Sequence, residues 1–175
     1  MDKDLAEQVV DVASRVVASG AISANGHGNV SIRVPGSDEM YFTAGPSLRN
    51  HPLSATAYAE AQRPIGCWVE ALAMFGLPTG VPVAGYGPRG SEEAVANIRG
   101  AVLPGVPAVL LSNHGVLVFY RTPELAIVVG GIVEEAAQAG INAGSLGGPV
   151  EIPDQLRAAA LQRAMAFDSA GTAHA

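Results

Sequence analysis

Two short apolar runs on either side of a polar turn most limit how this chain can fold. The runs Ala108–Leu111 and Val116–Phe119 are rich in Val and Leu, and Ser112-Asn113-His114-Gly115 lies between them. Runs of this length, bounded by turn residues, are typical of buried β-strands. Gly115 allows a sharp bend or a close backbone approach. We therefore expect His114 at the rim of a sheet, either as a hydrogen-bonded turn residue or as a functional side chain.

The composition fits one folded domain with a sizeable core. The chain has 175 residues, of which 49% are hydrophobic, and its mean hydropathy is +0.27. Charged residues make up 15%, against about 25% in ordinary proteins, which favours a homo-oligomer whose surface is partly covered. The net charge of −6, without a Lys/Arg cluster, argues against a nucleic-acid partner. Backbone N–H groups can still bind a phosphate locally.

Cysteine usage and hydropathy bear on the compartment. Cys67 is the only cysteine, so neither a disulfide framework nor a Cys-x-x-Cys metal site is expected. The longest apolar run, Leu125–Val133, is too short to span a bilayer, and the N-terminus lacks a signal-peptide pattern. We expect no membrane partner and a cytoplasmic location.

The periodicity predicts strands in hairpins with helices gathered around them. Helices are expected at 5–16, 54–63, 69–75, 92–99, 123–143 and from 154 onward, and strands at 30–34, 40–43, 81–84, 108–111 and 116–119. Ser91 and Thr122 are good N-caps, and Pro123 suits the first helical position. The tail from Ser169 is expected to fray. This order favours an α+β or α/β fold with a largely antiparallel sheet.

Three local patterns suit a binding or catalytic role. In Gly28-Asn29-Val30-Ser31-Ile32-Arg33, loop N–H groups and the Asn amide could hold a phosphate or carboxylate, although the same pattern also occurs at ordinary hairpin entries. Thr43-Ala44-Gly45-Pro46 offers a hydroxyl donor where a strand ends. In Asn50-His51-Pro52 a histidine precedes an Ala-rich helix, so His51 and His114 could supply two ligands of a catalytic metal. The other histidines are His27, in the loop assigned to anion binding, and His174, in the tail.

Taken in order, these segments resemble the class II aldolase/adducin head-domain family from about Leu5 to about Pro153. The stretch Tyr86–Glu93 looks especially like the aldolase branch of that family. The resemblance implies a three-layer α/β/α fold with a mixed, largely antiparallel central sheet. It also implies a homotetramer with active sites between subunits.

The resemblance further implies a site for a sugar phosphate and a divalent metal, commonly Zn²⁺. The metal is held by three histidines: His114 matches one, His51 matches the second member of a His-x-His pair, and Arg49 stands where the first belongs. Gly28, Asn29, Thr43 and Gly45 would bind the phosphate. The implied activity is aldolase (lyase) cleavage of a ketose 1-phosphate through a zinc-stabilised enediolate.

The chain departs from the family between Pro46 and His51. The family carries several elements there, including its catalytic carboxylate, and this chain carries almost nothing. A real deletion would leave unpaired sheet edges and a packing gap, so we favour a single domain over 1–175 with a segment missing from the sequence near 47–50. Glu70 is the substitute candidate for the proton-transferring carboxylate, against the alternative of a solvated helix-surface Glu.

Arg33 and Arg89 are secondary candidates for anion contacts, with a solvated surface as the alternative.

Two other functions stay open beside the lyase. The same fold and metal could run epimerase, dehydratase or decarboxylase chemistry. A non-catalytic adducin-like oligomerising domain is favoured by Arg49 and by the absent carboxylate, and disfavoured by the presence of His51, His114 and Asn29.

Overall fold

The computed structural model describes residues 3–18, 30–37, 40–42 and 63–172. These residues form the helices α1 (Lys3–Ala18), α3 (Glu70–Met74), α4 (Glu92–Ala101), α5 (Pro123–Gly144) and α6 (Asp154–Thr172). The strands are β1 (Ser31–Arg33), β2 (Met40–Phe42), β3 (Val83–Ala84), β4 (Ala108–Leu111) and β5 (Gly115–Val118). The polar loop before β1 and nearly all of the helix expected at 54–63 lie outside the described residues.

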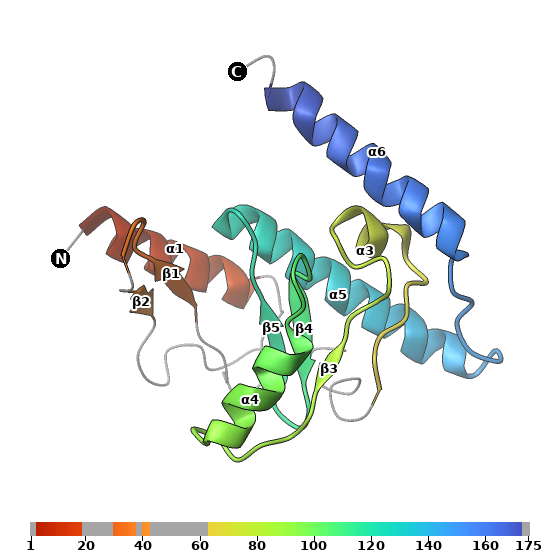
Figure 1. The fold of residues 1–175 in the computed structure, drawn as a ribbon, viewed down its shortest axis with the longest axis horizontal. Helices are drawn as coiled ribbons and strands as arrows, with labels where there is room; N and C mark the ends of the chain where they lie inside the picture. The colour runs from red at the N-terminus through yellow and green to blue at the C-terminus, as the bar shows by residue number, and fades with distance from the viewer. Residues whose placement is uncertain (1–2, 19–29, 38–39, 43–62, 173–175) are drawn as a thin grey trace.

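The described strands form two sheets (Figure 1). β1 and β2 make an antiparallel hairpin in which Ser31 pairs with Phe42. The second sheet has the order β3-β4-β5, with β3 parallel and β5 antiparallel to β4. The mixed sheet confirms the predicted α/β fold.

Helices cover both faces of the three-stranded sheet. α5 runs behind the sheet in Figure 1, and α4 lies in front of it. Side chains alternate between the faces of a strand. Accordingly, Ala108 and Leu110 belong to the buried cluster that includes α5, while the fully buried Val109 lies outside that cluster. The arrangement is the predicted three-layer one.

The core lies where α3 and α5 meet β4. Its largest fully buried apolar side chains come from α3, α5, β4 and the segments around α3: Ile65, Leu72, Leu77, Leu110, Val81, Val129 and Val133. Burying such a side chain contributes about 1.5–3 kcal/mol. Ala160 is the one residue of α6 in this cluster, among the side chains described. α6 therefore contributes little to the buried cluster itself, although it packs extensively against α3.

Trp68 occupies a slot made by two glycines. Its indole N–H donates to the Ala136 carbonyl of α5 at 2.7 Å. A Cβ on Gly140 would lie 2.6 Å from Trp68 Cζ2, and one on Gly66 would lie 2.7 Å from Trp68 Cζ3. Only the absence of both side chains lets the ring reach the helix.

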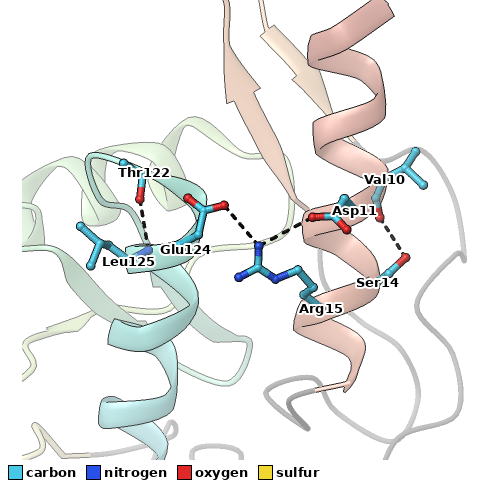
Figure 2. Close-up of polar contacts among 7 residues, drawn as sticks. All are labelled: Val10, Asp11, Ser14, Arg15, Thr122, Glu124 and Leu125. Carbon is cyan, nitrogen blue, oxygen red and sulfur yellow. Dashed lines mark hydrogen bonds and ion pairs between the residues drawn. The ribbon is translucent and has the colours of Figure 1, made fainter.

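The predicted helix starts are confirmed. Ser91 Oγ accepts from Ala94 N–H at 3.1 Å, and Thr122 Oγ1 accepts from Leu125 N–H at 3.3 Å (Figure 2). Pro123 opens α5 as expected. The frayed tail expected from Ser169 is wrong as far as Thr172, because α6 continues to that residue.

An ion pair joins α1 to the start of α5. Arg15 Nη1 donates to Glu124 Oε1 at 3.2 Å and lies 3.7 Å from Asp11 Oδ2 (Figure 2). The pKa of Glu124 lies below its usual value, chiefly because its own backbone N–H donates to the carboxylate, with further help from Thr122 and Arg15. These side chains are exposed, so the contact orients α1 more than it stabilises it. No helix in the described part of the chain is long and apolar enough to cross a membrane.

The Trp68 slot predicts opposite effects for two glycine-to-alanine changes in α5. Gly131 has open space around its Cα, so Gly131→Ala should stabilise the protein by about 0.5–1 kcal/mol through helix propensity. Gly140→Ala should destabilise it by about 1–3 kcal/mol, because the added methyl collides with Trp68. Urea unfolding followed by circular dichroism checks both changes. Equal effects at the two positions would rule out the slot.

Candidate metal and substrate site

A tight turn presents His114 at the end of β4. Leu111 pairs with Gly115, and His114 N–H donates to Leu111 O at 3.0 Å. Asn113 has a φ of +57°, in the left-handed region that several tight turns require. His114 is exposed at this turn. The prediction of a turn between two strands is confirmed.

The turn lies at the carboxyl end of the parallel pair β3 and β4. Ser112, directly after β4, donates its N–H to Ala84 O, at the end of β3, at 3.1 Å. In open α/β sheets ligands bind outside the carboxyl ends of parallel strands. His114 is therefore on the edge of the sheet where a site is expected.

The loop from β3 to α4 leaves from the same edge. Asn97 of α4 donates to Tyr86 O at 3.0 Å, and Ser91 N–H donates to Pro88 O at 2.9 Å. A Cβ on Gly87 would lie 2.5 Å from Ala94 N, so this glycine lets the loop rest on the first turn of α4. Tyr86 is 58% exposed.

Arg89, a predicted anion contact, is exposed on this β3–α4 loop. Tyr86 was not predicted as a site residue from the sequence. Its place in a glycine-rich loop directly after a strand was the sequence pattern that could have pointed to it. Arg33, the other secondary candidate, donates through Nε to Ser37 O at 2.9 Å and so supports the turn between β1 and β2.

Several predicted site residues lie outside the described part of the chain. These are Gly28, Asn29, Thr43, Gly45 and His51, together with Arg49, His27 and His174. Their roles stay predictions. Within the described residues, no three side chains of His, Cys, Asp or Glu are grouped so that they could hold a metal ion.

In the described part of the chain, Glu70 and His114 lie near opposite ends of β4. Its Oε1 accepts from Arg163 Nη2 of α6 at 3.2 Å, and both side chains are exposed. Just after α3, a Cβ on Gly76 would lie 3.3 Å from Gly105 O, shortly before β4 begins. The His114 turn follows the other end of β4. The proposed catalytic role of Glu70 stays a prediction.

Cys67 is a structural residue. It is fully buried, and its Sγ lies 3.9 Å from Val69 O. Burial raises the pKa of the thiol, although the nearby Arg157 acts in the opposite direction. A thiol that stays protonated is a poor nucleophile and a poor metal ligand.

The fold and the turn define a class of protein. The sequence profile of the Class II Aldolase and Adducin N-terminal domain matches residues 50–141, more than half of the chain. The chain belongs to this family, and the predicted resemblance is confirmed. A search of curated proteins found no match.

Solved structures of similar fold agree with this assignment. An L-fuculose 1-phosphate aldolase superposes with a TM-score of 0.74 at 20% identity, covering 93% of this chain and 97% of that one. YgbL from Klebsiella pneumoniae, described as a candidate aldolase/epimerase/decarboxylase, gives 0.62 at 17% identity, covering 82% and 91%. L-fuculose 1-phosphate aldolase from Glaciozyma antarctica PI12 gives 0.60 at 16%, covering 91% and 80%. At these identities the likeness shows the fold alone.

The packing of the β3–α4 loop predicts a contrast between two of its glycines. Gly87→Ala should destabilise the protein by about 1–3 kcal/mol, because the methyl would meet the backbone of Ala94. Gly85→Ala should stay within about 0.5 kcal/mol of wild type, because its Cβ would make ordinary van der Waals contact with the Asn97 side chain, at 3.5 Å from Nδ2. Urea unfolding monitored by Trp68 fluorescence measures both. A tolerated Gly87→Ala would show that the loop does not rest on α4.

Proposed function

We propose that this protein is a metal-dependent lyase that cleaves a sugar phosphate, such as a ketose 1-phosphate, by a retro-aldol reaction. The observation that carries the proposal is the exposed His114 at the carboxyl edge of β3 and β4, in a chain of the class II aldolase family. The fold of two L-fuculose 1-phosphate aldolases supports it. We further propose a cytoplasmic homotetramer.

His114 and His51 would hold the divalent metal, with zinc as the first candidate. The imidazole of His114 fits this role because it is exposed and makes no hydrogen bond with the side chains described, which leaves a ring nitrogen available for a cation. When bound, such an ion supplies Lewis-acid polarisation of the substrate oxygens, which stabilises the negative charge developed on cleavage. His114 would bind the metal from a turn that is hydrogen-bonded to β3 through Ser112 N–H and Ala84 O.

The β1–β2 hairpin supports the proposed phosphate site. Ser31 pairs with Phe42, so the chain enters β1 and leaves β2 at the same end of the hairpin. Gly28 and Asn29 come shortly before that pair, and Thr43 and Gly45 come shortly after it. We therefore propose these four residues as one anion site built from N–H groups, an amide and a hydroxyl.

The proton transfer is proposed for Glu70. Its exposed carboxylate is held by Arg163, so the residue has a second, structural role that must be separated by experiment. If Glu70 moves the proton, Glu70→Gln lowers kcat by about 10²–10⁴-fold and leaves zinc binding intact. The matched control is Glu92→Gln, which also changes an exposed Glu in the first turn of a helix. A kcat for Glu70→Gln equal to that of the control would remove Glu70 from the mechanism.

The second candidate function keeps the fold and the metal but changes the reaction. YgbL of the same fold is described as a candidate aldolase/epimerase/decarboxylase, so epimerase, dehydratase or decarboxylase chemistry is the alternative enzyme. Arg49, in place of an expected ligand, favours the third possibility of a non-catalytic adducin-like domain.

Metal binding tests the proposed function directly. Zinc at 100 times its dissociation constant should raise the stability of the metal-free protein by about 2.7 kcal/mol, visible as a higher Tm. His114→Ala and His51→Ala should each weaken zinc binding by more than about 100-fold, since even outer-shell partners are worth about 10- to 100-fold. His174→Ala serves as the histidine control.

The possible results separate the candidate functions. Zinc binding together with release of an aldehyde from ketose 1-phosphates supports the lyase. Zinc binding without cleavage favours the alternative enzymes. If wild-type protein neither binds zinc nor gains stability from it, all the metal-dependent functions fail, and the adducin-like domain is left.

A further inference from the structure

Asn113 adopts a left-handed backbone conformation. Among the residues that the structure describes, it is the only non-glycine with a positive φ, at +57°. The other described residues with a positive φ are all glycines: Gly36, Gly76, Gly80, Gly90, Gly105, Gly147 and Gly148. Left-handed backbone is unfavourable for residues that carry a Cβ, and asparagine tolerates it better than most. Such outliers cluster at functional sites, where the strain fixes a geometry.

Packing does not impose this conformation. Asn113 and His114 are both exposed, so no core contact holds the tip of the turn. Two backbone hydrogen bonds fix its base: His114 N–H to Leu111 O at 3.0 Å, and Ser112 N–H to Ala84 O at 3.1 Å. Between these bonds, the φ of residue 113 decides in which direction the Cα–Cβ bond of His114 points. The preference of residue 113 for left-handed backbone therefore limits the positions that the imidazole can reach.

We propose that Asn113 is a positioning residue, whose left-handed backbone holds His114 in the orientation in which it binds a divalent cation. This inference rests on the proposed function, in which His114 is a metal ligand. Asparagine suits the position because it adopts the left-handed region while being less free than glycine, which has no Cβ. The role belongs to the backbone of residue 113. It does not require the side-chain amide to touch the metal or the substrate.

The test compares substitutions that separate backbone from side chain. Asn113→Ala makes the left-handed backbone unfavourable, so the exposed turn should relax to another conformation. Part of the free energy of metal binding is then needed to restore the original conformation. We expect zinc affinity to fall about tenfold, measured by calorimetry on metal-free full-length protein. Asn113→Gly restores free access to the left-handed region and should bind zinc within about threefold of wild type. Ser112→Ala is the matched control, since residue 112 has no positive φ.

Cobalt substitution gives a second readout. The visible absorption of bound Co²⁺ depends on ligand geometry, so it should change in Asn113→Ala and match wild type in Asn113→Gly. Equal losses of affinity in the Ala and Gly variants would overturn the proposal, because they would assign the role to the side-chain amide. A lower Tm for Asn113→Ala with unchanged zinc affinity and cobalt spectrum would also overturn it, since the turn would then be only structural. If wild-type protein binds no zinc, the proposed function and this inference fail together.

Discussion

Burial of one side of α5 is the interaction on which the described fold depends. Val129 and Val133 are completely inaccessible, and they share one apolar cluster with α3 and β4. The Ala136 carbonyl of the same helix accepts a hydrogen bond from the indole N–H of Trp68, and Glu124 at the start of the helix pairs with Arg15 of α1. α1, α3 and the sheet are therefore positioned relative to one another through this single 22-residue helix. Its Thr-Pro start matters because it fixes where the buried side begins along the chain.

The candidate site lies outside this core, at the carboxyl end of β3 and β4. β3 and β4 end together, and the loop to α4 and the turn to β5 both leave from that edge. The core next to this edge is fully buried, and backbone hydrogen bonds from Ser112 and His114 hold the exposed turn. A packed scaffold with an exposed turn is the usual way in which a fold holds functional side chains.

Local features were predictable from the sequence, and long-range ones were not. The strands around His114 and the Ser91 and Thr122 caps were predicted, because periodicity and cap chemistry act within a few residues. The mixed sheet was expected only through the family resemblance. The Glu70–Arg163 pair joins residues 93 positions apart, and no local pattern encodes such a contact. The helix that carries Glu70 was predicted, but its position relative to the carboxyl end of β4 was not, for the same reason. The predicted phosphate residues and His51 lie in segments outside the described structure.

The two partners of β4 have different consequences for how the edge assembles. β5 follows β4 after a short turn, so the β4–β5 hairpin closes a small loop and we expect it to form quickly. Val83 of β3 pairs with Leu110, and the intervening chain includes all of α4. Parallel pairing across such a crossover is intrinsically slower. The bond from Ser112 to Ala84 therefore belongs to the later event. The edge that carries His114 is completed only when β3 docks.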